Sequence, residues 1–435
     1  VPVVDSIGRL VGRITVDDVM DEVREHAESA KYDVSCASSG TVRSNKPGML
    51  GNTVGGWGIC HSFAEDGRCI SLLKVMLTNY CIYDCAYCIN RRSNDLPRAT
   101  LSVSELVELT IEFYRRNYIE GLFLSSGVVR SPDYTMERLV RVAKDLRQVH
   151  RFNGYIHLKS IPGASRELVN EAGLYADRLS VNVEIPKEEN LKLLAPEKDH
   201  KSVFAPMKYI QQGVLESKEE RQKFRHAPRF APAGQSTQMI VGATSESDKD
   251  ILYLSSALYG RPTMKRVYYS GYVSVNTYDT RLPALKQPPL VRENRLYQAD
   301  WLLRFYQFKV DEIVDDAYPD LDLEIDPKLS WALRHPEQFP VDINRADYEM
   351  ILRVPGIGVK SAKLIVASRR YSKLGYYQLK KIGVVMKKAQ YFITCSELPV
   401  RTVNEMTPQT VRSLLLPKPV RKKTDENQLS FVFSD

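Results

Sequence analysis

The sequence predicts an α/β fold with parallel strands, followed by an all-α region. Two observations favour this. Short apolar runs alternate with amphipathic helical segments between residues 72 and 270, and the pattern after residue 326 is helical with glycine-containing turns. The 435 residues suggest two or three domains. Hydrophobic content of 43% and charged content of 26% are typical of a soluble globular protein.

Six apolar runs are predicted to be the strands of the sheet: Leu72–Thr78, Gly121–Ser125, Tyr155–Lys159, Arg178–Glu184, Thr237–Val241 and Arg266–Ser270. A helix is expected between the first two, from Val103 to about Asn117, because its apolar residues recur at helical spacing. In a parallel barrel, functional side chains gather where the strands end. We therefore expect the functional site at the carboxyl ends of these runs.

The chain is expected to divide into five segments. Residues 1–28 predict two strands and a helix and resemble the end of a CBS module, but they are too short to form its core, so a fusion or a misassigned start is expected. Residues 29–70 form a cysteine-containing extension, 71–325 the α/β barrel and 326–416 the all-α domain. Residues 417–435 are polar, basic and predicted to be disordered.

Three cysteines lie directly after the first predicted strand, with the spacing C-x3-C-x2-C: Cys81, Cys85 and Cys88. Three thiolates on one short loop suit an iron–sulfur cluster. They do not suit a structural zinc site, which usually takes four ligands in two separated pairs. A [4Fe–4S] cluster held by three cysteines would leave one iron open to a substrate or cofactor.

Three further cysteines precede the first strand: Cys36, Cys60 and Cys69. They could form a second metal site or cluster, or one could donate a hydrogen atom to a substrate radical, but ordinary buried or loop thiols are favoured. Cys395 is expected in the core of a C-terminal helix. Seven cysteines without a secretory leader predict a reducing, cytoplasmic location, and no apolar run approaches the ~20 residues that span a bilayer.

The cysteine spacing, with Tyr87 before the last cysteine, resembles the signature of the radical S-adenosylmethionine (radical SAM) superfamily. The resemblance implies a partial (β/α)6 TIM-like barrel. It also implies that Cys81, Cys85 and Cys88 hold a [4Fe–4S] cluster whose open iron binds S-adenosylmethionine. An electron from a donor such as flavodoxin or ferredoxin would then release a 5′-deoxyadenosyl radical that removes a hydrogen atom from the substrate.

The resemblance also places cofactor-binding residues at the strand ends. Ser125-Ser126-Gly127 stands where many members have Gly-Gly-Glu for the methionine amino group, and the glutamate is absent. The other expected contacts are Lys159 with the methionine carboxylate, Asn182 and Glu184 with the ribose, Ile240 and Gly242 near the adenine, and Tyr87 of the cysteine motif.

The basic charge of the chain is concentrated at its C-terminal end. Residues 341–435 hold 17 basic and 8 acidic residues, a balance of +9, whereas the whole chain carries +8. Such a localised excess is typical of a module that binds a polyanion, most often nucleic acid.

The same region resembles a helix-hairpin-helix motif. A helix is expected from Val341–Asp347 to Leu352, then the hairpin Pro355-Gly356-Ile357-Gly358, then a helix from Lys363 to Arg369. Both glycines are expected to adopt positive φ next to a phosphate, Ile357 to enter the core, and the second helix to offer its amino end to the anion together with Lys360 and Lys363. A weaker second copy contains Gly383 and Lys387.

A barrel of this kind joined to such hairpins resembles a bacterial family of DNA modification or repair radical SAM proteins. The resemblance implies a nucleic-acid substrate, DNA in preference to RNA. The alternatives are a tRNA-modifying radical SAM enzyme and a DNA-binding protein whose cluster only senses redox state. The run Gln428–Phe433 resembles a peptide that docks on the bacterial DNA sliding clamp.

Overall fold

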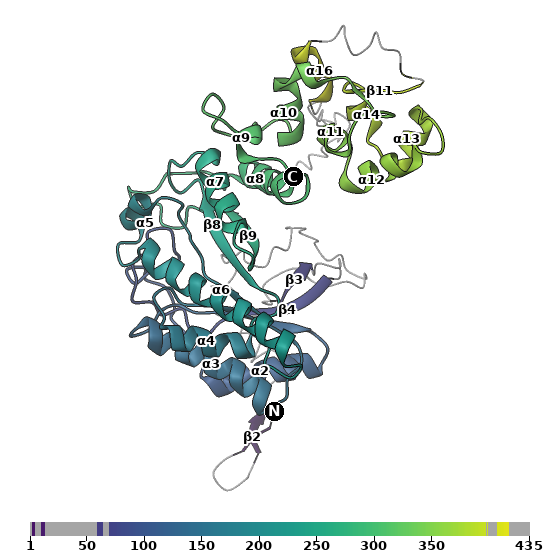
Figure 1. Ribbon diagram of the computed structural model, residues 1–435. Coiled ribbons are helices and arrows are strands. Elements are labelled where there is room, and N and C mark those ends of the chain that lie inside the picture. Colours follow the sequence, from purple (N-terminus) through teal and green to yellow (C-terminus); the bar gives the residue numbers. More distant parts are fainter. Residues whose placement is uncertain are drawn as a thin grey trace, which may run out of the picture. The chain divides into compact units, whose positions relative to one another are not determined.

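The computed structural model describes residues 2–4, 10–13, 59–63, 69–396, 398 and 407–416 (Figure 1). The predictions for Cys36, for the helix after residue 15 and for the tail with Gln428–Phe433 lie outside these residues. The chain forms two compact units, Val1–Tyr297 and Gln298–Asp435. No helix among the described residues is long and apolar enough to cross a membrane.

The first unit is built on a seven-stranded sheet whose strands follow each other in chain order. Six parallel strands, β4 to β9, curl into a partial barrel, which confirms the predicted fold class. An antiparallel strand, β3, extends the sheet beside β4. The strands are β3 (Ile59–Phe63), β4 (Cys69–Met76), β5 (Gly121–Ser125), β6 (Tyr155–Lys159), β7 (Arg178–Ser180), β8 (Gln235–Val241) and β9 (Met264–Gly271).

Helices cover the outside of this sheet. Figure 1 shows α2, α3, α4 and α6 side by side along it, and α2–α3, α3–α4 and α4–α6 are in contact. The helices are α2 (Val103–Arg115), α3 (Pro132–Gln148), α4 (Arg166–Tyr175), α5 (Glu188–Leu194), α6 (His200–Lys223), α7 (Asp248–Tyr259) and α8 (Leu290–Phe305). The predicted helix at Val103 starts where Ser102 and Glu105 form a capping box.

Strands β5 and β6 have the predicted bounds, whereas β7 is shorter than predicted. The prediction ran to Glu184, but β7 ends at Ser180. Beyond Ser180 an isolated bridge joins Glu184 to Met239, and Glu184 itself adopts a left-handed conformation with φ of 64°. The short N-terminal strands were also predicted, and they are β1 (Pro2–Val4) and β2 (Leu10–Arg13), paired antiparallel.

The described part of the second unit is mainly helical. Besides the short β10 (Val341–Asp342) and β11 (Ile393–Thr394), which pair in parallel, it contains a 3-10 turn, η1 (Pro336–Gln338). Its helices are α9 (Val310–Ile313), α10 (Pro327–Arg334), α11 (Tyr348–Arg353), α12 (Val359–Ser368), α13 (Tyr376–Ile382), α14 (Met386–Ala389) and α16 (Pro408–Leu415).

Three predictions in this unit are wrong in detail. The helix expected from Val341 begins only at Tyr348, because Val341 and Asp342 pair with β11 instead. The helix expected from Lys363 begins four residues earlier, at Val359, with Gly358 at its N-cap. Cys395 follows β11 outside any helix and is half-buried, so it is not a helical core residue.

Candidate functional site

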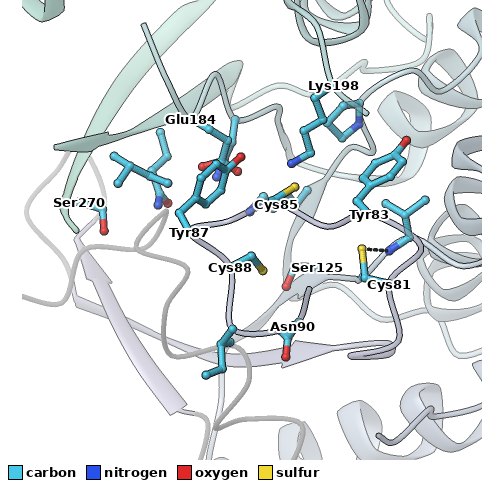
Figure 2. Close-up of a pocket in the computed structure, with 18 of the residues that line it drawn as sticks. Cys81, Tyr83, Cys85, Tyr87, Cys88, Asn90, Ser125, Glu184, Lys198 and Ser270 are labelled. Carbon is cyan, nitrogen blue, oxygen red and sulfur yellow. Dashed lines mark hydrogen bonds between the residues drawn. The ribbon is translucent and has the colours of Figure 1, made fainter. Parts of the chain in front are cut away.

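The loop that carries the three cysteines follows β4 and is fixed to the strand ends and loops around it. The backbone N–H of Val128 donates to the Cys81 Sγ atom over 3.4 Å, as Figure 2 shows. The Ile82 N–H donates to the Val128 carbonyl over 2.8 Å, and the Ala86 N–H donates to the Leu194 carbonyl over 2.7 Å. These contacts hold the loop over the carboxyl ends of the strands.

A segment after β9 holds the same loop from another side. The Asn276 side chain is 1% exposed, and its amide donates to the carbonyls of Ala86, over 2.6 Å, and Cys88, over 3.0 Å. Nearby, Arg91 forms an ion pair with Asp279 over 2.7 Å, and both side chains are buried. Hydrogen bonds from Arg281 and then Arg91 hold the pKa of Asp279 well below its usual value, so its carboxylate stays charged at neutral pH.

All three cysteines line one cavity, which opens at the carboxyl ends of β4 to β9. This is the place that the sequence predicted. The structure also brings eight of the nine predicted cofactor-binding residues to this cavity: Tyr87, Ser125, Ser126, Gly127, Lys159, Asn182, Glu184 and Ile240. Gly242 does not line it. Its φ of 84° instead turns the chain after β8, beside Pro289.

The stretch that replaces Gly-Gly-Glu passes very close to the cysteine loop. A Cβ atom at Gly127 would overlap the Tyr80 carbonyl oxygen, so only glycine fits there. The Gly127 N–H donates to the Thr78 carbonyl over 2.8 Å. The Ser126 hydroxyl donates to the Gly127 carbonyl over 2.6 Å, so its proton is already engaged. Ser125 is buried in the cavity wall.

Asn182 supplies a test of whether these residues suit a nucleoside cofactor. Its side chain is 3% exposed, yet neither its amide oxygen nor its amide nitrogen has a hydrogen-bond partner among the described residues. A buried polar group without a partner costs about 1–3 kcal/mol. The hydroxyl of Tyr87 is also buried without a partner there. A ribose or similar polar ligand would satisfy such groups, so the residues fit the cofactor.

The donor set fits a cluster better than a single ion. Among the side chains that the structure describes, no group of three His, Cys, Asp or Glu converges on one metal-ion position. An iron–sulfur cube does not need this, because each thiolate binds a different iron. Burial raises the pKa of the Cys85 thiol and raises that of Cys88 to about 12. Cluster binding must therefore displace thiol protons.

Lys198 is a site residue that the sequence prediction missed. It lies between α5 and α6, with its ammonium group 5.9 Å from the ring centres of both Tyr83 and Tyr87. Figure 2 shows it pointing into the site near Cys85. Burial lowers the pKa of Lys198, but Cys85, Tyr87 and Glu184 raise it more, so the net pKa is well above its usual value. Lys198 lies in the connection between two helices rather than at a strand end, and it belongs to no sequence motif.

Other missed residues lie on strands that the prediction did identify. Gln238 and Ser270 line the cavity from β8 and β9. Gln238 could have been found, because it is two residues before Ile240 and so faces the same side of the strand. Of the cysteines outside the motif, Cys60 and Cys69 lie on the neighbouring strands β3 and β4.

Residues 75–214 match the family model of the Radical SAM superfamily, and no curated protein sequence matches the chain. Among solved structures, the chain is similar to HydG, a maturase of the [FeFe]-hydrogenase (15% identity, 82% of this chain and 83% of that chain covered, TM-score 0.40). It is also similar to methylornithine synthase PylB (12% identity, 64% of this chain and 66% of that chain covered, TM-score 0.39). A third similar structure is coproporphyrinogen III oxidase HemN from Escherichia coli (14% identity, 59% of this chain and 56% of that chain covered, TM-score 0.31). The family match and the cysteine spacing together identify residues 75–214 as a radical SAM superfamily domain, the part of this enzyme that uses a [4Fe–4S] cluster and S-adenosylmethionine.

Proposed function

We propose that this enzyme acts on nucleic acid, DNA in preference to RNA, as a modification or repair enzyme. The observation that carries the proposal is the pair of glycine hairpins in the second unit and the charge around them. Residues 351–390, which contain both hairpins, hold ten basic residues and no acidic residue. Seven of the ten are exposed: Lys360, Lys363, Arg370, Lys373, Lys380, Lys381 and Lys387.

The first hairpin has a backbone that suits a helix-hairpin-helix motif. Gly356 has a φ of 90°, and a Cβ atom there would lie 2.7 Å from the Val385 carbonyl oxygen. Pro355 and Ile357 are buried, as expected for residues that anchor the turn. Gly358 departs from the expectation, because its φ is −95°. The hairpin therefore needs one left-handed glycine rather than two.

The second hairpin packs directly against the first. The Val385 N–H donates to the Gly356 carbonyl over 2.9 Å. Gly383 caps α13 with a φ of 93°, matching the left-handed Gly356. Two joined hairpins with lysines at their helix ends support contact with successive phosphates. Contacts of this kind position a protein on a duplex without selecting its sequence.

The residues of the barrel are assigned by the same proposal. Cys81, Cys85 and Cys88 would hold the cluster, while Asn182 and Glu184 would bind the ribose and Lys159 the methionine carboxylate. The bound cluster and S-adenosylmethionine supply a radical that removes a hydrogen atom. We expect an electron donor such as flavodoxin or ferredoxin, and docking on the DNA sliding clamp through Gln428–Phe433.

Three measurements test the proposal. Protein reconstituted without oxygen and supplied with dithionite should release 5′-deoxyadenosine from S-adenosylmethionine, and Cys85→Ala should abolish the release. Release by wild type equal to that by Cys85→Ala would contradict the assignment of the cluster. The sliding-clamp contact is tested by deletion of Gln428–Phe433, which should abolish capture by the clamp.

For the hairpins, we compare the double variant Gly358→Glu/Lys360→Glu with the control Lys309→Glu, an exposed lysine of the same unit. The double variant should bind duplex DNA more weakly whatever the sequence, and its affinity should depend less steeply on salt, by about one unit of slope for each lost phosphate contact. Unchanged affinity at low salt would remove the hairpins from the proposal. Tighter binding to a tRNA transcript than to duplex DNA would favour the tRNA alternative.

A further inference from the structure

The lining of the barrel beneath the cysteine loop includes polar side chains from five strands or strand ends. Parallel barrels normally fill this space with bulky branched apolar side chains. Here, five consecutive strands or strand ends each present a polar residue to the cavity, whereas β4 presents Met76 and β8 adds the apolar Ile240. We call the five residues the polar ring: Ser125, Lys159, Asn182, Gln238 and Ser270.

The proposed cofactor contacts use only part of the polar ring. Ser125 belongs to the methionine end, Asn182 to the ribose and Lys159 to the carboxylate. Gln238 and Ser270 have no such assignment. They lie on the paired strands β8 and β9, where Ser270 is opposite Ile240, two residues from Gln238. The two side chains are thus diagonal neighbours on the same face of the sheet, within reach of one ligand.

The space in front of these two residues is limited in depth. One layer further into the barrel, the rings of Phe123 and His157 are in edge contact, with centroids 4.6 Å apart. The His157 Nε2 atom lies 2.9 Å from the Ser180 hydroxyl. All three side chains are buried. This packed layer therefore closes the barrel beneath Gln238 and Ser270 and limits the depth of the cavity there.

The remaining lining supplies apolar surface for a ligand bound there. Ile161, Val273 and Val275 line the same cavity, while Gln238 is only 4% exposed. A carboxamide offers one donor and one acceptor side by side, and a hydroxyl offers either. Apolar faces with a donor–acceptor edge are the chemistry that holds a nucleobase.

We propose that Gln238 and Ser270 bind the edge of a single nucleobase that has been extruded from its duplex. The inference rests on the proposed nucleic-acid function and adds the form in which the substrate is bound. A base that remains stacked in a duplex cannot reach residues buried inside a barrel, so it must leave the stack. The second unit would hold the backbone, while the polar ring receives one base.

The test compares two labelled duplexes that differ only in one central pair, matched or mispaired. Protein reconstituted without oxygen binds them in the presence of S-adenosylmethionine and without reductant, so that no turnover occurs. A mispair removes part of the cost of extrusion, which is a few kcal/mol. Wild type should therefore bind the mispaired duplex about tenfold more tightly than the matched one.

Substitutions at Gln238 and Ser270 test whether these residues cause the preference for the mispaired duplex. In Gln238→Leu/Ser270→Ala the ratio of the two affinities should fall to about one, whereas the control Lys208→Met, an exposed residue of α6, should keep the wild-type ratio. Iron content verifies that each variant holds its cluster. If the double variant loses its cluster, Gln238→Glu is tested in its place. This substitution keeps the shape of the side chain but replaces a hydrogen-bond donor by an acceptor, so it should change which central mispair is preferred.

The outcomes separate this inference from the function on which it rests. Equal wild-type affinity for the two duplexes would overturn extrusion and leave the nucleic-acid function standing. A preference for the mispaired duplex that stays unchanged from wild type in both Gln238 variants would overturn the assignment to these residues. Failure to bind either duplex would overturn the proposed function, and the extruded base with it.

Discussion

Replacement of Asn276 by alanine should loosen the cysteine loop although Asn276 is almost 190 residues away from it in sequence. Its amide donates to the carbonyls of Ala86 and Cys88, and its oxygen accepts from the Asn94 side chain over 2.8 Å. The Cys88 carbonyl keeps a second, longer hydrogen bond from the Arg91 N–H, at 3.4 Å. Replacement of Asn276 therefore leaves mainly the Ala86 carbonyl without a hydrogen-bond donor.

The size of the effect follows from these contacts. A buried carbonyl that loses its donor costs about 1–3 kcal/mol, and each of the other two hydrogen bonds contributes about 1 kcal/mol. We expect the loop to lose roughly 3 kcal/mol of stability against local opening. Since 1.4 kcal/mol corresponds to a factor of ten, the open loop should become about 100-fold more populated.

Hydrogen exchange of the loop amides measures this population directly. The N–H groups of Ile82, Ala86 and Arg92 all donate to backbone carbonyls, so they exchange only when the loop opens. In Asn276→Ala they should exchange about 100-fold faster than in wild type. Asn294→Ala, which removes an exposed asparagine, is the control. An increase below about threefold, equal to that of the control, would refute the reasoning.

Three further predictions follow from single residues. Gly127→Ala forces a Cβ atom into the Tyr80 carbonyl and should cost more than 2 kcal/mol of unfolding free energy, which urea denaturation would measure. Gly356→Ala combines a φ of 90° with a 2.7 Å contact and should destabilise the second unit by about 2 kcal/mol, while Gly358→Ala, whose Cβ atom would make only an ordinary 3.5 Å contact with the Tyr306 hydroxyl, should be nearly neutral. Burial lowers the pKa of Lys328 to about 7. The unfolded chain holds that proton up to a higher pH, so stability should rise above pH 7, by up to ~1.4 kcal/mol per pH unit, and Lys328→Met should remove that rise.

The features that the sequence predicted well are the local ones. Strands β5 and β6 are buried on both faces, so they stand out as short apolar runs between polar segments, and their bounds are correct. The cysteine spacing is equally local, because three ligands lie within eight residues. The polar residues that end the strands follow from the strand assignments, since parallel strands bring their carboxyl ends together.

The features that were missed depend on contacts between distant residues. The pairing of Val341 with Ile393 spans about fifty residues and turns an expected helix into a strand. The positive φ of Glu184, four residues after the end of β7, is unusual for a glutamate, and the residue type gives no sign of it. Lys198 and Asn276 reach the cysteine loop from a helix connection and from the segment after β9, and neither belongs to a local pattern.

The charges around the cavity suggest how the two lysines divide their roles. Glu184 is the one carboxylate among the described residues that line it, against the ammonium groups of Lys159 and Lys198. A cluster with three thiolates is negatively charged, and Lys198 is the lysine whose pKa responds to Cys85 and Cys88. Lys198 is therefore positioned to offset the charge of a cluster bound by these cysteines, whereas the role we propose for Lys159 is to bind the methionine carboxylate. The absent glutamate leaves the methionine amino group without an acidic partner at Ser125–Gly127. Because the carbonyls of Ser125 and Gly127 already accept hydrogen bonds from Leu77 and Ser126, the Ser126 carbonyl is the acceptor in that stretch best suited to replace it.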